Sequence, residues 1–264
     1  MKTTSILSFS ASLLLALPAV AGTTIQPAGP SAVMTTTTEG GLEITLGLYA
    51  WGAGVDGDTG FGGFVAPVDI SFSDILSSLD MTAMGMLELR KGPWMFQLEG
   101  LYLKNSIESQ PFTTAGGGPF TAELVARTTR VQPMIGYRVV ENESTKVDLL
   151  AGAVYYDISN QLSFRGVGAP PRVSGGDDWI DPMVGVRVVQ RVSERVIFSG
   201  RADIGGFGVN SDLAWQLVGM FGYELKDSIN LFAGWRHAAV DYDKNGFTYD
   251  VANSGPILGA TFTW

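Results

Sequence analysis

The sequence predicts an all-β protein, a closed antiparallel transmembrane β-barrel of about ten strands with one short helix in a loop. Three observations lead to this prediction. Segments of roughly ten residues alternate between apolar and polar side chains, and the connections between them alternate between short and long. Only 16 % of the residues are charged, where about a quarter is usual for a soluble protein. A lipid-facing exterior explains this shortage of charge.

The N-terminal residues have the pattern of a secretory signal peptide. An apolar stretch follows Lys2 and ends before a small-residue cleavage site at Ala19-Val20-Ala21. This stretch is shorter than the roughly 20 residues that a membrane-spanning helix needs. We therefore expect three parts in a protein of the cell outer membrane: a signal peptide over 1–21, a periplasmic segment over 22–41 and the barrel domain over 42–264.

The composition excludes several classes of function. The chain carries 26 acidic and 17 basic residues, a net charge of −9, and has no basic patch with which to hold nucleic acid. It contains no cysteine, which excludes disulfides and thiol chemistry. No linker divides the mature part, so we expect one domain without a cofactor.

Alternation with a period of two marks the strands. In the first, Leu42, Ile44, Leu46 and Leu48 alternate with polar or small residues, which predicts one lipid-facing side. Nine further segments have a comparable pattern or length. The ten predicted strands are Leu42–Gly52, Asp80–Arg90, Trp94–Lys104, Thr121–Val140, Lys146–Ile158, Trp179–Val192, Val196–Phe207, Asp212–Leu225, Ile229–Tyr242 and Gly255–Trp264.

The connections between these strands alternate in length. Short turns are predicted at Lys91–Gly92, Glu141–Ser144, Ser193–Glu194 and Lys226–Ser228. The other connections are mostly longer, namely Ala53–Leu79, Asn105–Phe120, Ser159–Asp178, the brief Gly208–Ser211 and Asp243–Ser254. Short periplasmic turns and longer outer loops are typical of outer-membrane barrels, and an even strand number places both termini in the periplasm.

The C-terminal strand carries a family resemblance. Its apolar face ends in Phe262 and Trp264, and the terminal sequence GPILGATFTW resembles the assembly signal of bacterial outer-membrane β-barrel proteins. Further phrases are similar to an uncharacterised group of Gram-negative outer-membrane barrels: YAWGAGVDGDTG, SFSDILSSLD, DIGGFGVNSDLAWQ and DYDKNGFTYDV. The resemblance implies recognition by the barrel assembly machinery and periplasmic chaperones, and it implies no specific activity.

Charged residues of both signs are predicted to line the barrel interior. The predicted network consists of Glu43, Glu88, Arg90, Glu99, Arg187, Arg201, Asp203 and Arg236, with Asp148 and Asp181 as additional candidates. A barrel of about ten strands has a narrow interior, because eight strands are just filled by side chains and an aqueous channel needs roughly sixteen. We therefore expect a lumen plugged by ion pairs, and the alternative is a narrow path for ions or small solutes.

One helical signal lies in the first long loop, from Ser71 to Asp80. A capping pattern begins it, and its apolar residues recur at helical spacing: Phe72, Ile75, Leu76 and Leu79. The helix could rest at the outer membrane interface, pack on the barrel rim or cover the mouth as a lid.

Two loop motifs match binding patterns in part. The glycines of Gly52–Gly57 fit a dinucleotide pattern, but no βαβ unit surrounds them, so they are predicted to form turns. Asp241, Asp243 and Asn245 match the first half of a calcium loop, but Ala252 occupies the position of the closing carboxylate. A weak calcium site and a plain polar turn are the alternatives there.

The one histidine gives the only catalytic lead. His237 precedes Asp241 by four residues, and ten-stranded barrel proteases of the omptin family use an Asp/His pair beside paired aspartates. Two residues four apart on a strand are about 13 Å from each other, too far for a hydrogen bond. We therefore expect a structural or surface-interaction barrel that contacts outer-membrane lipid and lipopolysaccharide without catalysis. A narrow pore and an omptin-like or lipid-modifying hydrolase are the alternatives.

Overall fold

The computed structural model describes residues 41–264 except 63, 78, 109–111, 114–118 and 167–171. The predicted signal peptide lies outside these residues, as does the segment over 22–40. The elements are β1 Glu43–Trp51, β2 Gly54–Phe61, β3 Phe64–Ile70, α1 Phe72–Ser77, β4 Leu79–Lys91, β5 Trp94–Glu108, β6 Phe112–Thr113, β7 Pro119–Glu141, β8 Thr145–Arg165, β9 Val173–Arg191, β10 Val196–Gly206, β11 Leu213–Lys226, β12 Ile229–Lys244 and β13 Phe247–Thr263.

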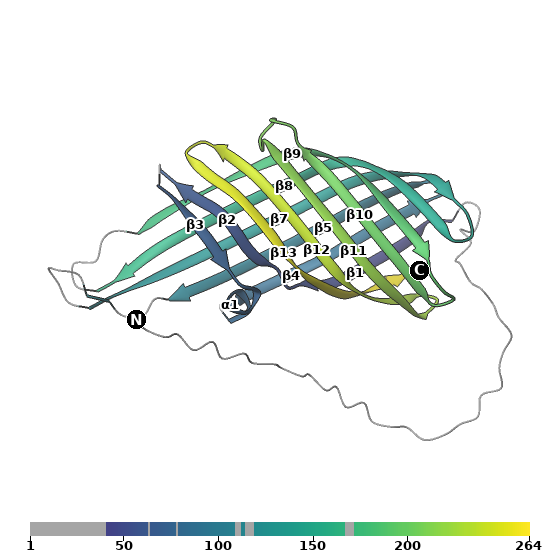
Figure 1. Ribbon diagram of the computed structural model, residues 1–264, viewed down its shortest axis with the longest axis horizontal. Helices are drawn as coiled ribbons and strands as arrows, with labels where there is room; N and C mark the ends of the chain where they lie inside the picture. The colour runs from purple at the N-terminus through teal and green to yellow at the C-terminus, as the bar shows by residue number, and fades with distance from the viewer. Residues whose placement is uncertain (1–40, 63, 78, 109–111, 114–118, 167–171) are drawn as a thin grey trace, which may run out of the picture. The chain divides into compact units, whose positions relative to one another are not determined.

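Ten of these strands form a closed antiparallel barrel (Figure 1). The order around the wall is β1, β4, β5, and then β7 to β13 in sequence, and β1 pairs with both β4 and β13. The closing register places Thr45 opposite Thr263 and Trp51 opposite Ile257. The predicted fold class, a closed barrel of about ten strands with a short helix, is confirmed.

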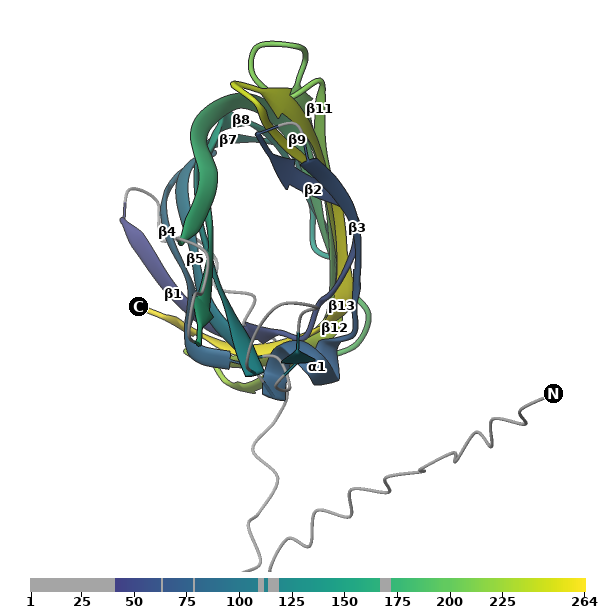
Figure 2. The same ribbon diagram turned by 90° about the vertical axis from the view of Figure 1, so that its left-hand side faces the viewer.

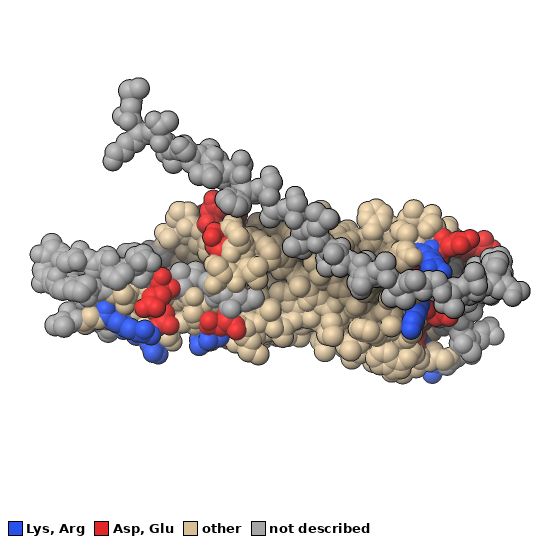
Figure 3. Space-filling model, turned by 90° about the horizontal axis from the view of Figure 1, so that it is seen from below, with Lys and Arg blue, Asp and Glu red and all other residues tan. Residues whose placement is uncertain are grey.

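The two faces of the wall differ as the alternation predicts. In β5, Trp94, Phe96 and Leu98 are exposed on the outside, whereas Gln97 and Glu99 are buried inside. Leu, Val, Ile and aromatic side chains occupy the outer face of the other strands in the same way. Figure 3 shows charged side chains gathered toward the two ends of the long axis, with an uncharged band between them. This band is the surface that a bilayer core would cover.

The two ends of the barrel are built differently. One end, here called the turn end, holds the short connections after β4, β7, β9 and β11 together with the C-terminus (Figure 1). At the opposite, extended end the strands continue well beyond the roughly 9 to 11 residues that cross a bilayer. β7 has 23 residues, β8 has 21 and β9 has 19. The long connection predicted at Ser159–Asp178 therefore belongs largely to β8 and β9.

Two other predicted loops are also strands. The Ala53–Leu79 connection contains the hairpin of β2 and β3, and β2 pairs with the first half of β13 from Phe247 to Ser254. The Asp243–Ser254 connection is wrong as a loop because β12 and β13 continue through it to a two-residue turn at Asn245 and Gly246. Both turn residues have positive φ, 56° and 73°, as a tight hairpin turn requires.

The short β10–β11 hairpin allows the longer strands on either side of it, β9 and β12, to meet. β10 has 11 residues. Its connection to β11 lies nearer the turn end than the tips of β9 and β12 do. Above it, the Tyr242 hydroxyl on β12 donates to Asp177 on β9 at 2.5 Å. A Cβ atom placed on Gly175 of β9 would lie 2.6 Å from the Cβ of Phe61 on β2. Beyond the short β10–β11 hairpin, β9 thus contacts β12, β13 and β2.

The helix α1 lies on the outer side of the wall. Gly52 carries no side chain, and the ring of Phe72 packs over it, 3.0 Å from the position of a Cβ. Ser71 caps the helix through its bond to the amide of Asp74, as the capping pattern predicts. Figure 2 shows α1 at the edge of the ring of strands and not across its middle. The helix therefore packs against the barrel and does not cover its mouth as a lid. It is shorter than the predicted Ser71–Asp80, because Leu79 and Asp80 already belong to β4.

Among the described residues, no helix is both long enough and apolar enough to cross a membrane.

The tight turn at Gly246 gives a prediction about stability. Replacing Gly246 by Ala is expected to lower the free energy of unfolding by about 1 kcal/mol, because a side chain with Cβ disfavours positive φ. Gly246→Asn is the matched control, since Asn tolerates this conformation and should cost less. Urea unfolding in detergent micelles measures both. Equal stability of the Ala variant and the wild type would contradict the turn geometry.

Candidate functional site

The barrel interior is the candidate site, and its side chains form three layers. Because paired residues of neighbouring strands point to the same face, alternate residues of every strand enter the lumen. From the turn end to the extended end these are a first charged layer, a second charged layer and an aromatic layer. We call the first charged layer the turn-end cluster and the second the middle cluster.

The turn-end cluster consists of Glu88, Arg90, Arg138, Asp148 and Arg187. Asp148 is 1 % exposed and is the centre of the cluster. It binds Arg90 at 3.1 Å, Arg138 at 3.0 Å and Arg187 at 2.7 Å. Glu88 binds Arg187 at 2.6 Å and Arg90 at 3.2 Å. Two carboxylates therefore join strands β4, β7, β8 and β9 by charge-assisted bonds across the lumen.

The middle cluster is centred on Glu99 and contains Arg130, Arg201, Asp203 and Arg236. Glu99 accepts a bond from Arg236 and lies 3.8 Å from Arg130 and 3.9 Å from Arg201. Arg201 also binds Asp203 at 2.9 Å.

Neutral side chains complete the middle cluster. The Tyr49 hydroxyl donates to Glu99 at 2.6 Å, and Arg236 donates to Gln216 at 2.7 Å. Gln97 accepts a bond from Arg201, while Gln132 and Gln216 donate to Asp203. Gln132 and Gln216 are almost entirely buried, which makes the cluster a continuous polar network from one wall to the other.

The aromatic layer lies in the lumen toward the extended end. The ring of Trp179 stacks between Tyr156, at a centroid distance of 5.1 Å, and Tyr242, at 3.9 Å. Phe247 lies beside Tyr242 at 6.3 Å. Trp179 is 4 % exposed, and Tyr242 and Phe247 are 2 % exposed. Since β9 provides Trp179 and β12 provides Tyr242, the stack lies where these two strands meet.

A buried carboxylate anchors this layer. The Trp179 indole N–H donates to Asp181 and to Ser211, both at 3.0 Å. Asp181 also accepts bonds from the amide and the hydroxyl of Ser211, at 2.9 Å and 2.5 Å. Ser211 lies at the end of the short β10–β11 connection, so this connection fixes the orientation of the tryptophan.

The lumen residues predicted from the sequence divide among the three layers. Of the network proposed from sequence, Glu88, Arg90, Arg187 and Asp148 join the turn-end cluster, and Glu99, Arg201, Asp203 and Arg236 join the middle cluster. Asp181 belongs to the aromatic layer. Glu43 stands opposite Arg90 in the register of β1 and β4, but among the described residues it forms no ion pair.

Sequence reasoning missed several members of the lumen. They are the cluster residues Tyr49, Gln97, Arg130, Gln132, Arg138 and Gln216, and the aromatic layer of Tyr156, Trp179, Tyr242 and Phe247. Arg130, Gln132 and Arg138 occupy even positions of one strand, so their alternation was a usable signal. The aromatic residues were missed because their segments were interpreted as strand ends or loops.

The catalytic lead and the calcium motif are not assembled. His237 faces outward, 4.9 Å from the ring of Trp215, and Arg236 points into the lumen. Asp241 and Asp243 lie on the exposed face of β12, and Asn245 donates its amide to Asp177 at 2.8 Å. Among the described residues no cluster of acidic or histidine side chains could hold a metal ion. The physical reason is that a straight strand replaces the expected calcium-binding loop.

The remaining sequence motifs are the glycine segment and the C-terminal aromatic residues. The Gly52–Gly57 segment joins β1 to β2 and opens no helix, so the geometry of a phosphate-binding turn is absent there. Phe262 faces outward near the C-terminal end of β13, and Trp264 is 64 % exposed. The Trp264 amide donates to the Ile44 carbonyl at 3.0 Å, so the C-terminal residue takes part in closing the barrel.

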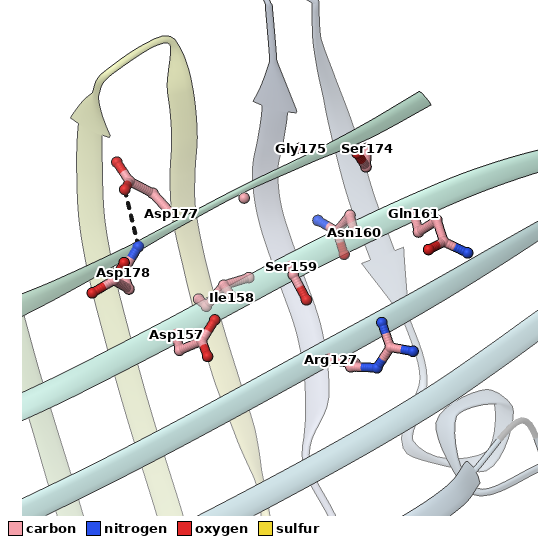
Figure 4. Close-up of a pocket in the computed structure, with 11 residues that line it drawn as sticks. Arg127, Asp157, Ile158, Ser159, Asn160, Gln161, Ser174, Gly175, Asp177 and Asp178 are labelled. Atoms are coloured by element: carbon pink, nitrogen blue, oxygen red, sulfur yellow. Dashed lines mark hydrogen bonds between the residues drawn. The ribbon is translucent and has the colours of Figure 1, made fainter. Parts of the chain in front are cut away.

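A polar groove of about 450 Å³ lies at the extended end, on strands β7, β8 and β9 (Figure 4). Asp157 and Asp178 stand directly opposite each other across β8 and β9, and Arg127 lies on the neighbouring strand. Hydroxyl and amide side chains complete the lining, among them Ser159, Gln161 and Ser174. The groove thus offers both signs of charge together with neutral hydrogen-bonding groups.

Comparison with known proteins identifies the fold. No protein family model matches the chain, and no curated protein matches it in sequence. The chain is similar in structure to the outer membrane protease OmpT from Escherichia coli, with a TM-score of 0.50 and 12 % identity over 89 % of this chain and 100 % of that chain.

Weaker structural matches belong to the same architecture. The translocator domain of the autotransporter NalP from Neisseria meningitidis has a TM-score of 0.40 and 11 % identity, over 87 % of this chain and 90 % of that chain. Ail, the attachment invasion locus protein of Yersinia pestis, has a TM-score of 0.33 and 13 % identity, over 86 % and 100 %. The likeness to OmpT, together with the closed ten-stranded wall, shows that the chain has the fold of Gram-negative outer-membrane β-barrel proteins.

The middle cluster predicts a large cost for losing its central carboxylate. Glu99→Gln is expected to lower the free energy of unfolding by about 3 kcal/mol, because three buried arginines lose their shared counter-charge. The matched control is Glu123→Gln, since the Glu123–Arg165 pair is partly exposed and its loss should cost under about 1 kcal/mol. Chemical unfolding of both variants tests this. Equal losses would contradict the central role of Glu99.

Proposed function

We propose that the protein is an outer-membrane barrel whose lumen is sealed, and that it serves as a structural or surface-interaction protein without catalytic activity. The observation that supports this proposal is the succession of three packed layers inside the wall. Their central residues, Asp148, Glu99 and Trp179, are each at most 8 % exposed. A continuous aqueous path needs unfilled space in every layer, and ten strands leave little.

Location in the outer membrane is part of the proposal. The apolar outer face and the closed hydrogen-bond ladder together meet the requirements of a lipid environment, where every backbone polar group needs an internal partner. The turn end would then face the periplasm, as short turns do in such barrels. Phe262 and Trp264 would serve the barrel assembly machinery as the assembly signal, with periplasmic chaperones delivering the chain.

Interaction at the outer surface would use the extended end. The polar groove around Arg127 and Asp157 has the mixture of charge, hydroxyl and amide groups that hydrated sugars and phosphates require. We place the contact with lipopolysaccharide there. Hydrolysis is not proposed, because His237 lies on the apolar face. Ser254 stands opposite it on β13, but the Ser254 hydroxyl accepts from Trp235 at 3.0 Å, and no hydrogen bond among the described residues joins it to the histidine.

Single-channel recording in a planar bilayer tests the sealed lumen. The wild-type protein is expected to give no conductance steps. Steps should appear when all three layers are emptied together by Trp179→Ala, Tyr242→Ala, Glu99→Ala, Arg236→Ala, Asp148→Ala and Arg187→Ala. Both partners of an ion pair are removed in each charged cluster, because this avoids a buried unpaired charge.

The control is a barrel with only the aromatic layer changed, carrying Trp179→Ala and Tyr242→Ala. The two charged clusters remain in this variant, so it should stay silent. Heat-modifiable migration on a gel establishes that each variant is folded. Stable conductance steps from the wild type would contradict the proposal and favour the narrow pore.

A further inference from the structure

Four buried nitrogen atoms in the middle of the lumen have no hydrogen-bond acceptor. They are Trp51 Nε1, Arg130 Nη1, Arg201 Nη2 and Arg236 Nε. They lie close together, because all three guanidinium groups are within 4 Å of the Glu99 carboxylate and the Trp51 ring is 4.6 Å from Arg236. Buried polar groups in proteins nearly always have a partner. Four donors in one place therefore indicate a missing acceptor.

The middle cluster also carries an excess of positive charge. It has three arginines and two acids, a net charge of 3 − 2 = +1. The turn-end cluster has the same balance, but its Arg138 also binds the more exposed Glu141 at 3.1 Å, and Lys146 lies 3.8 Å from that carboxylate. None of the turn-end arginines has a buried unpaired nitrogen. The excess charge and the unpaired donors therefore occur together only in the middle cluster.

The other described residues do not supply this charge. Asp181 is the next carboxylate along the lumen, but it accepts its bonds from Ser211 and Trp179 and forms no ion pair with a described residue. Gln97, Gln132 and Gln216 contact the arginines with neutral oxygen atoms. The described part of the chain therefore leaves the middle cluster without a further negatively charged acceptor.

We propose that the middle cluster binds one small monovalent anion, such as chloride, among Arg130, Arg201 and Arg236. A spherical anion accepts N–H bonds from several directions at once, and its single charge equals the deficit of the cluster. This inference is independent of the sealed-lumen proposal, because the charge deficit exists whether or not ions pass along the barrel.

Diffraction from crystals grown in bromide tests the site directly. An anomalous peak is expected between the three guanidinium groups, within hydrogen-bonding reach of the unpaired nitrogen atoms. Density without an anomalous signal would indicate water, and absence of any density would indicate an empty site. Either of these results would overturn the proposal.

Thermal unfolding of the folded protein in detergent gives a second test. The midpoint of the wild type should be about 3 °C higher in sodium chloride than in sodium gluconate of equal ionic strength, because a ligand that binds only the folded state stabilises it. Gln97→Glu should abolish this difference, since it places a carboxylate beside Arg201 without a change in size. An equal midpoint of the wild type in both salts would overturn the proposal.

The matched control is Gln190→Glu, the same chemical change at a position near the turn end, where Gln190 accepts from Thr145 at 2.6 Å. It should retain the chloride dependence of the wild type. Loss of the dependence in this control would assign the effect to general electrostatics and overturn the proposal. If the Gln97 variant does not fold, the bromide peak and the wild-type midpoints still decide.

Discussion

The pairing of β1 with β13 is the constraint on which the rest of the structure depends. It leaves the barrel wall without an unpaired edge, and it converts the two faces of a sheet into an outside and an inside. Once the register of Thr45 opposite Thr263 is fixed, every alternate side chain is committed to the lumen. Charged residues such as Glu99 and Asp148 are then buried, and they have to find partners across the barrel.

The aromatic layer forms because the strands of the wall differ in length. The short β10–β11 hairpin leaves β9 free to contact β12, so Trp179 stacks on Tyr242 where a taller hairpin would have separated them. Ser211, at the end of that hairpin, holds Asp181 and through it the indole ring. Between this layer and the turn end, long arginine side chains occupy the interior instead of aromatic rings.

Alternation predicted the strands wherever one face meets lipid and the other meets the lumen, as in the burial of Glu88 and Arg90. It failed beyond the apolar band, where the outer face is polar and the inner face is aromatic. There Asp241, Asp243 and Asp250 resemble a loop, although Asn245-Gly246 is a strong hairpin signal. The partners of the arginines were not predictable, because contacts such as Arg187 to Glu88 join residues 99 positions apart.

Disulfide trapping across the extended end is the most direct test of the central claim that the opposite walls meet. The chain contains no cysteine, so Phe61→Cys with Gly175→Cys introduces a single defined pair. Their Cβ positions, 2.6 Å apart, lie closer than the roughly 3.5 to 4.5 Å of a disulfide, so a small outward shift of either strand brings the pair into bonding geometry. Mild oxidation of the folded barrel should therefore join them, as a count of free thiols would show. Two free thiols in the oxidised, folded protein would contradict the account, because they would mean that the walls stand apart and the lumen is open at that end.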